Sequence, residues 1–230
     1  LVTSNTSSIP IKLLSDGRSD EFKKHFCGTH FFNPPRYLRL LEVIPTKETD
    51  PSVIDFFMHF GDVTLGKQTV LCRDTPAFIA NRIGVMSGTA LVHLTIDYKM
   101  TIEEVDAITG PLIGRPNTAT FKLQDLVGLD TSEKVSSFVS SAVKNDDFFE
   151  DLKTKEVPAF MDYLLDNKYY GNKSGKGFYQ KTKERDSKGK SIINVLNLES
   201  LKYEKTVRPK LKIVKAVSYT HLRAHETQFH

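Results

Sequence analysis

A histidine and a glutamate in neighbouring apolar segments are the residues of this chain best suited to acid–base chemistry. His30 lies in the apolar run Gly28–Phe32, and Glu42 lies in the run Leu40–Ile44. Because burying an unpaired carboxylate is costly, Glu42 should have a partner, and His30 is the economical choice. Such a pair stabilises an imidazolium, which suits a general base that works near neutral pH. Spacing alone leaves open an ordinary core histidine beside an unrelated glutamate.

Two other constellations resemble known sites but lack a required part. Ser7, His30 and Glu42 could form a hydrolase triad, but Ser7 is not in the G-x-S-x-G turn that exposes a nucleophilic serine. The glycine-rich segment 171–177 resembles a phosphate-binding loop. It is one residue short, and glycine stands where serine or threonine must follow the lysine. We therefore expect neither a covalent serine nor a phosphate loop.

The first 75 residues have the pattern of an α/β domain. The runs 28–32, 40–44 and 69–72 are short, apolar and bounded by polar or turn-forming residues, as strands are. Asp50 followed by Pro51 is typical of a helix start, and this helix should end near Gly61. These strands would position His30 and Glu42.

After residue 75 the sequence has the pattern of a mainly helical domain. Thr75 can cap a helix, and Pro76 can occupy its first position. Apolar residues then recur at helical spacing, which predicts a long helix with its apolar stripe in the core of a second domain: Ile79, Ile83, Met86, Ala90 and Leu94. Thr101 and Glu104 form a capping box for a further helix, and 158–165 is another helix candidate. The segment 192–196 suggests a small hairpin or an extended stretch.

Charge is distributed unevenly along the chain, whose net charge is +4. Between Lys181 and Lys215 there are eleven Lys and Arg residues against four Asp and Glu residues. A basic stretch can bind nucleic acid, but this one has a single aromatic residue, Tyr203, and no recognisable binding motif. A solvated surface or linker is the better interpretation. No run of 18 apolar residues occurs, so we expect neither a nucleic-acid nor a membrane partner.

The ends of the chain and its cysteines bear on its origin. The start, Leu1 to Asn5, has neither an initiator methionine nor the regions of a signal peptide, so we expect a chain cut within a domain.

Cys27 and Cys72 are interpreted as small buried hydrophobes in a reducing, cytoplasmic setting. Residues 217–230 resemble read-through of a cloning adaptor. Their His221 and His225 have helical metal-ligand spacing but no third ligand, so no metal site is expected.

Six motifs resemble, in order and spacing, those of the 3-hydroxyacyl-CoA dehydrogenase family. They are SNTSS at 4–8, GTHFFNPP at 28–35, LEVI at 41–44, DTPAFIANR at 74–82, DLVGLDT at 125–131 and KSGKGFY at 173–179. The resemblance covers roughly residues 1–210 and is strongest to the dehydrogenase part of bacterial multifunctional fatty-acid oxidation proteins. GRPNTATF at 114–121 departs from the usual glycine-proline-phenylalanine wording, in a region concerned with helix packing.

The resemblance implies a role for each matching residue. His30 would be the catalytic base that takes the proton of the substrate 3-hydroxyl, and Glu42 would orient and polarise it. Ser7 would hydrogen-bond the substrate oxygen near the nicotinamide of NAD. Asn81 and, more weakly, Asn33 would bind substrate. Lys173 would reach the cofactor, with Ser7 as its other contact in this chain.

The implied architecture is α/β followed by all-α. It consists of a C-terminal remnant of a Rossmann-type NAD-binding domain at 1–75, a helical dehydrogenase domain at 76–180, a basic extension at 181–216 and a non-native tail at 217–230. The G-x-G-x-x-G fingerprint of dinucleotide sites does not occur in the chain, and the resemblance places it upstream. A sheet that lacks its first strands would leave an unpaired edge.

The implied activity is NAD-dependent oxidation of (S)-3-hydroxyacyl-CoA to 3-oxoacyl-CoA in fatty-acid β-oxidation, with this chain as an incomplete and, alone, inactive fragment. An acyl-CoA would be the substrate, and the helical domain would pair in a homodimer or with another part of a longer chain. The cleft would lie between the two domains. One alternative is a non-catalytic fragment or degenerate relative that only folds or dimerises. Another is a related dehydrogenase of a different 3-hydroxy acid or acyl carrier.

Overall fold

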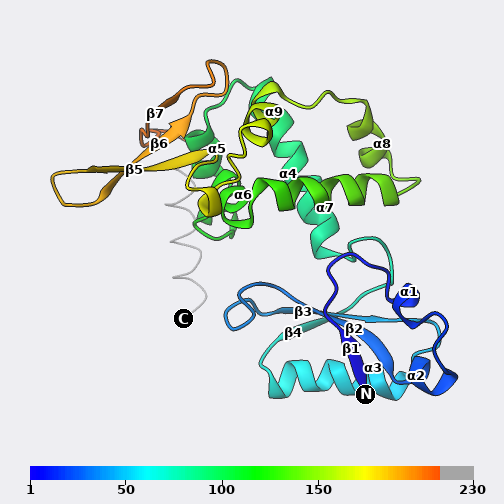
Figure 1. The fold of residues 1–230 in the computed structure, drawn as a ribbon. Coiled ribbons are helices and arrows are strands. Elements are labelled where there is room, and N and C mark those ends of the chain that lie inside the picture. Colours follow the sequence, from blue (N-terminus) through cyan, green and yellow to red (C-terminus); the bar gives the residue numbers. More distant parts are fainter. Residues whose placement is uncertain (213–230) are drawn as a thin grey trace. The chain divides into compact units, whose positions relative to one another are not determined.

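The chain forms two compact units in the computed structural model, which describes residues 1–212. Unit 1 contains Leu1–Met86 and Ser137–Leu152, and unit 2 contains Ser87–Ser136 and the described residues from Lys153 onward. Each unit is a separate body with its own sheet (Figure 1). The predicted tail at 217–230, with His221 and His225, lies outside the described residues.

The sheet of unit 1 has four strands in the order β1-β2-β3-β4, namely β1 (Val2–Ser4), β2 (Phe26–Phe31), β3 (Leu40–Pro45) and β4 (Gln68–Leu71). The pairs β1–β2 and β3–β4 are parallel, whereas β2 and β3 run antiparallel. All three predicted strands are therefore confirmed within a residue or two at their ends. The register places His30 of β2 directly opposite Glu42 of β3, and β1 is an edge strand.

Short helices surround this sheet: α1 (Ile11–Ser15), α2 (Asp20–Lys24) and α3 (Pro51–His59), which continues into a π-helical turn, η1 (Phe60–Thr64). Figure 1 shows α3 running along one face of the sheet. Asp50 caps α3 with its side chain and Pro51 follows it, as predicted. Apolar side chains from the helices, the sheet and the segment between β4 and α4 form the core, namely Ile11, Phe26, Ile44, Cys72 and Phe78.

The long helix α4 (Ala80–Asp97) differs from its prediction in two ways. It begins after Thr75 and Pro76, because Ala77 and Phe78 adopt left-handed φ angles of 60° and 52° that break the helix. The predicted apolar stripe is also not in the core, since the exposed fractions of Ile83 and Leu94 are 55% and 43%. The buried residues of α4 are Val92 and Thr95 instead. The helical periodicity identified an apolar face of α4 correctly, but it did not show whether that face is buried.

The helices beyond residue 100 are α5 (Ile102–Ile108), η2 (Pro111–Ile113), α6 (Phe121–Val127), α7 (Leu129–Ala142), α8 (Asp147–Thr154), α9 (Ala159–Asp166) and η3 (Asn172–Ser174). Thr101 and Glu104 form the predicted capping box of α5. The core of unit 2 consists of Val92, Ile102, Val105, Phe121, Leu129, Phe160, Leu164, Phe178, Val195 and Leu196. In the described residues, no helix is both long and apolar enough to cross a membrane.

A second sheet follows the helices in unit 2. Its strands are β5 (Tyr179–Arg185), β6 (Ser191–Leu196) and β7 (Tyr203–Lys205), all antiparallel and in that order. Of the two structures predicted for 192–196, a hairpin or an extended stretch, the hairpin is confirmed. Figure 1 shows the turn between β5 and β6 extending beyond the helices of unit 2. Because Val195 and Leu196 are buried in the helical core, the sheet is packed onto unit 2 and is not a free linker.

Candidate active site

The pair predicted from the sequence is present at the centre of unit 1. His30 Nδ1 lies 2.7 Å from Glu42 Oε2, and both residues are almost fully buried, with 3% and 1% of their surface exposed. The two side chains meet because the register of β2 and β3 places them opposite each other. A charge-assisted hydrogen bond at this distance is strong, since little water competes for either group.

The second oxygen of Glu42 is held by the backbone at the start of α4. Glu42 Oε1 accepts the N–H groups of Ile79 at 3.1 Å and Ala80 at 2.8 Å. These are N–H groups that a helix start leaves without intrahelical partners. Burial alone would raise the pKa of Glu42, but the hydrogen bonds from His30, Ala80 and Ile79 outweigh it and hold the pKa below its ordinary value. Glu42 is therefore a carboxylate at neutral pH.

An ionised Glu42 determines which nitrogen of His30 can accept a proton. A carboxylate only accepts hydrogen bonds, so Nδ1 of His30 carries the proton and Nε2 of the neutral ring keeps its lone pair. Within the part of the chain that the structure describes, no protein group is hydrogen-bonded to Nε2. The rings of Phe32 and Phe78 lie 4.4 and 5.8 Å from the imidazole, centroid to centroid. This arrangement is that of an oriented general base.

The polar loop after β1 is tied to the end of β2. Asn5 accepts the N–H of Phe31 through its side-chain oxygen at 2.9 Å, so the loop reaches the residue next to His30. Ser7 is exposed in this loop. Asn81, in the first turn of α4, donates its side-chain amide to the carbonyl oxygen of Ser7 at 3.3 Å. Ser7, His30, Glu42 and Asn81 thus belong to one connected region of unit 1.

The residues of this region fit a bound nucleotide. β1 and β2 are parallel, so the Ser7 loop and His30 lie at the same carboxyl edge of the sheet. Open α/β sheets bind nucleotides at the carboxyl ends of their strands. The polar, exposed loop beside the oriented base therefore lies at the edge of the sheet where a nucleotide would bind.

Two predicted site residues are less closely linked to the pair. Asn33 follows the end of β2 and is exposed. Lys173 belongs to unit 2, where its ammonium forms an ion pair with Asp130. Side-chain hydrogen bonding and the charge of Lys173 hold the pKa of Asp130 below its ordinary value. The described contacts of Lys173 are therefore with α7 and its neighbourhood.

The two cysteines are buried in unit 1, with 0% and 3% of Cys27 and Cys72 exposed. Burial raises the pKa of the Cys27 thiol to about 11. Burial, with Glu42 nearby, raises that of Cys72 to about 12. Both thiols are protonated at neutral pH and are poor nucleophiles, which agrees with their interpretation as buried hydrophobes.

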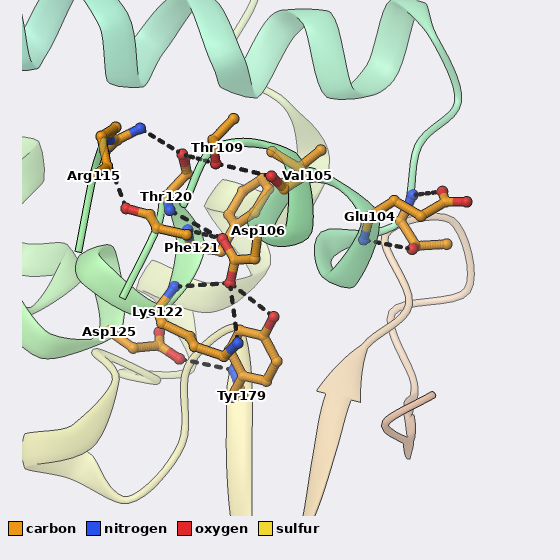
Figure 2. A network of polar contacts seen from close by, with 12 residues as sticks. Glu104, Val105, Asp106, Thr109, Arg115, Thr120, Phe121, Lys122, Asp125 and Tyr179 are labelled. Atoms are coloured by element: carbon orange, nitrogen blue, oxygen red, sulfur yellow. Dashed lines mark hydrogen bonds and ion pairs between the residues drawn. The ribbon is translucent and has the colours of Figure 1, made fainter. Parts of the chain in front are cut away.

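Unit 2 contains a buried carboxylate that the sequence did not single out (Figure 2). Asp125 Oδ1 and Oδ2 accept the N–H groups of Phe178 and Tyr179, each at 2.8 Å. Burial raises the pKa of Asp125 to about 6, against the effect of these two backbone hydrogen bonds, and nearby Asp106 adds to the rise. A Cβ atom on Gly171 or Gly177 would collide with Asp125. Gly177 of the KSGKGFY motif, together with Gly171 just before that motif, therefore allows the loop to close around Asp125 of the DLVGLDT motif.

Asp106 holds the start of α6 in the same network. Its carboxylate accepts the N–H groups of Thr120 at 3.0 Å, Phe121 at 2.7 Å and Lys122 at 3.3 Å. Figure 2 shows the hydroxyl of Tyr179 pointing at the same carboxylate, to which it donates at 2.8 Å. The network joins α5, α6 and β5.

Several buried carboxylates accept backbone N–H groups that are distant in the sequence, which explains why the sequence did not predict these hydrogen bonds. Glu42, Asp74 and Asp106 each accept N–H groups at the start of a helix, and Glu42 is 37 and 38 residues from its donors. Local capping rules search only within a turn of the helix start. The one available signal was an acidic residue in an apolar run, and that signal identified Glu42 but neither aspartate.

Comparison with known proteins assigns both parts of the chain to one family. Residues 1–75 match the profile described as 3-hydroxyacyl-CoA dehydrogenase, NAD binding domain. Residues 78–181 match the profile described as 3-hydroxyacyl-CoA dehydrogenase, C-terminal domain. The two matches include all the residues discussed above as a candidate site.

Individual relatives agree with these profiles. A probable 3-hydroxyacyl-CoA dehydrogenase of Bacillus subtilis is 48% identical over 181 residues, 79% of this chain and 22% of the relative. A putative fatty acid oxidation complex trifunctional enzyme of Rickettsia felis is 36% identical over 203 residues, 88% of this chain and 28% of the relative. The crystal structure of (S)-3-hydroxybutyryl-CoA dehydrogenase PaaH1 from Ralstonia eutropha is similar with a TM-score of 0.63 and 26% identity, over 76% of this chain and 58% of that one. The chain thus spans less than two thirds of each.

Proposed function

Because the chain belongs to the 3-hydroxyacyl-CoA dehydrogenase family, we propose that the protein containing it oxidises (S)-3-hydroxyacyl-CoA to 3-oxoacyl-CoA with NAD. The proposal places this activity in fatty-acid β-oxidation, with an acyl-CoA as the substrate. The Rickettsia relative, whose name includes fatty acid oxidation, supports that assignment.

The buried His30–Glu42 pair is the observation that carries the proposal. A family likeness alone would also fit a degenerate relative, but such a relative has no need of an ionised carboxylate in its core. Glu42 loses its hydration on burial and is compensated by three hydrogen bonds, from His30, Ile79 and Ala80. The same atoms leave His30 Nε2 ready to accept a proton. This geometry is what abstraction of a proton from a hydroxyl requires.

The proposed reaction separates the two hydrogens of the substrate carbinol. His30 Nε2 takes the proton of the 3-hydroxyl, and a carbonyl forms at C3. The chemistry that NAD supplies when bound is acceptance of the hydride from C3. Glu42 stabilises the resulting imidazolium through the 2.7 Å hydrogen bond to Nδ1. In the reverse direction the protonated His30 returns its proton to the oxygen and acts as an acid.

The remaining site residues are proposed to bind and orient the reactants. Ser7 hydrogen-bonds the substrate oxygen beside the nicotinamide, which its exposed position in the loop after β1 permits. Asn81 and Asn33 hold the substrate, and the hydrogen bond from Asn81 to the Ser7 backbone supports a shared location. Lys173 contacts the cofactor. For that it must exchange its ion pair with Asp130 for an anionic group of the nucleotide.

We also propose that the exposed apolar face of α4 pairs with a second helical surface, either in a homodimer or within a longer chain. Ile83, Met86 and Leu94 expose 55%, 38% and 43% of their surface on this helix. Apolar faces of this kind mark interfaces. Ile83→Lys or Leu94→Lys should therefore lower the mass measured by sedimentation if the pairing joins two chains, or lower the free energy of unfolding of the full-length product if the pairing is internal, whereas Ile193→Lys on β6 should do neither. Both α4 variants unchanged in both measurements would argue against the pairing surface. A cytoplasmic location is proposed because both cysteines are free.

The decisive test is NADH oxidation with acetoacetyl-CoA, followed by absorbance. It is measured on the 230-residue chain and on the full-length product of the gene that encodes it. Activity in the full-length product supports the proposed function, and activity in that protein alone identifies the 230-residue chain as an incomplete enzyme. Absence of turnover in a folded full-length product would overturn the proposal and favour a non-catalytic relative or a different 3-hydroxy substrate.

A further inference from the structure

The segment between β4 and α4 touches both halves of the candidate site. Asp74 accepts the N–H of Ile11 through Oδ1 and the N–H of Lys12 through Oδ2, each at 2.8 Å. A few residues later, the N–H groups of Ile79 and Ala80 hold Glu42. One stretch of chain therefore connects the start of α1 to the carboxylate that orients His30.

Asp74 caps the start of α1, which has no side-chain cap of its own. The residue at its N-cap is Pro10, which has no side-chain donor or acceptor, and no side-chain cap is formed locally. Both free N–H groups of the first turn are instead satisfied by a carboxylate 62 and 63 residues away in the chain. A negative charge at a helix start is also favoured by the helix dipole. Asp74 is half-buried, so solvent only partly screens this contact.

The position of α1 determines where the Ser7 loop ends. The loop is anchored at its beginning by Asn5, which accepts the N–H of Phe31, and in its middle by the hydrogen bond from Asn81 to Ser7. Its end enters α1, and there Asp74 provides two hydrogen bonds rather than one. Loss of Asp74 would leave the loop with single hydrogen bonds at its beginning and middle, and its end would be held only by the packing of Ile11 in the core.

We propose that Asp74 is a positioning residue that holds the Ser7 loop in register with the His30–Glu42 pair. The inference rests on the proposed function, because Ser7 matters only if it binds the reactants. Asp74 acts through the loop and touches neither His30 nor Glu42. Its loss should therefore misplace Ser7 without changing the protonation of the base. Small displacements of a positioning group lower rates by about 10–100-fold.

The test uses Asp74→Asn in the full-length product, with Asp50→Asn as the matched control. Asparagine at position 74 keeps one acceptor but turns an NH2 group toward a backbone N–H, so one of the two hydrogen bonds is lost. Asp50 caps α3 through a single oxygen, Oδ1, which asparagine can replace. We expect kcat/KM to fall about 10–100-fold in Asp74→Asn and to stay unchanged in Asp50→Asn.

Two further measurements separate positioning from general loss of stability. In a Ser7→Ala background, Asp74→Asn should cause little additional loss, because the residue it positions is already gone. The pH dependence of kcat should stay as in the wild type. Multiplicative losses in the double variant, or a shifted pH profile, would overturn the assignment to the Ser7 loop.

If the wild-type protein does not turn over acetoacetyl-CoA, that result counts against the proposed function alone. The inference about Asp74 can still be tested by amide hydrogen exchange. Peptides covering residues 5–12 should exchange faster in Asp74→Asn than in the wild type, whereas Asp50→Asn should leave them unchanged. Equal exchange in all three proteins would show that Asp74 does not hold the loop, and the inference would fall whatever the activity.

Discussion

Each unit contains a buried carboxylate that accepts two consecutive backbone N–H groups, yet the two carboxylates behave in opposite ways. Glu42 in unit 1 is held by Ile79 and Ala80, and Asp125 in unit 2 is held by Phe178 and Tyr179. Their exposed fractions are 1% and 3%. The pKa of Glu42 is nevertheless lowered, whereas burial raises that of Asp125 to about 6.

The difference lies in the third neighbour. Glu42 also receives a hydrogen bond from His30, a group that can become a cation, while Asp125 has a second acid, Asp106, close by. Two backbone hydrogen bonds thus do not by themselves offset the rise in pKa that burial causes in Asp125, whereas in Glu42 the further hydrogen bond from His30 reverses the direction. In the proposed mechanism the charge of Glu42 orients His30. In unit 2, Asp125 holds the segment that contains Phe178 and Tyr179.

Removal of the ring of His30 should have the largest effect. His30→Gln in the full-length product eliminates the proposed base, and general acid–base catalysis typically contributes about 10²–10⁴-fold. We expect kcat to fall by that factor with a smaller change in KM, measured by NADH oxidation with acetoacetyl-CoA. The control is His25→Gln, since His25 is also paired with a glutamate, Glu21, but at the surface. Unchanged turnover in His30→Gln would refute the mechanism.

Neutralising Glu42 should affect activity through the tautomer of His30. In Glu42→Gln the amide oxygen can still accept the N–H groups of Ile79 and Ala80, so the NH2 group faces Nδ1 of His30. The imidazole proton then moves to Nε2, and the base has no free lone pair toward the substrate. We expect a loss in kcat of about 10²–10⁴-fold, as wrong-tautomer variants of other enzymes show. A protein that folds normally and keeps its kcat would indicate that Glu42 is only structural.

Asp125 should make the stability of unit 2 depend on pH in the sense opposite to Glu42. The folded pKa of about 6 exceeds the ordinary 3.8, so the contribution of Asp125 is fully present below pH 3.8 and is lost as pH rises through 6. The loss is on the order of 3 kcal/mol. Glu42, with its lowered pKa, contributes stability above its ordinary pKa of 4.5 that is lost as pH falls further.

Asp125→Asn tests this sign directly. The variant loses one backbone hydrogen bond and should be less stable than the wild type at pH 4.5, by about 1–3 kcal/mol. Because asparagine does not titrate, the stability gap between the two proteins should narrow between pH 4.5 and 7.5. Urea unfolding at both pH values, with hydrogen exchange in α6 and β5 to assign the change to unit 2, measures it. A gap that is constant or widens would contradict the raised pKa.

The same pair of carboxylates shows how far the sequence alone could predict the structure. His30 and Glu42 were identifiable because each stands in an apolar strand, where a polar residue needs a partner. Asp125 was hidden in a helix with mixed polarity, and its partners are 53 and 54 residues away. The start of α4 was predicted at Thr75 by local rules, but its actual cap is Glu42, in another strand. Local patterns predict elements, whereas contacts across the chain determine where those elements begin.

The smallest expected effect comes from a donor that cannot become a cation. Tyr179 donates its hydroxyl to Asp106 at 2.8 Å, and burial together with Asp106 raises the pKa of the phenol, which stays neutral. Tyr179→Phe keeps the ring, and three backbone N–H groups still reach Asp106. The free energy of unfolding should therefore fall by only about 1 kcal/mol, measured by urea unfolding against the exposed control Tyr98→Phe. A loss several times larger would mean that this hydroxyl contributes much more than one ordinary hydrogen bond to a buried carboxylate, and the contrast with the hydrogen bond between His30 and Glu42 would then not hold.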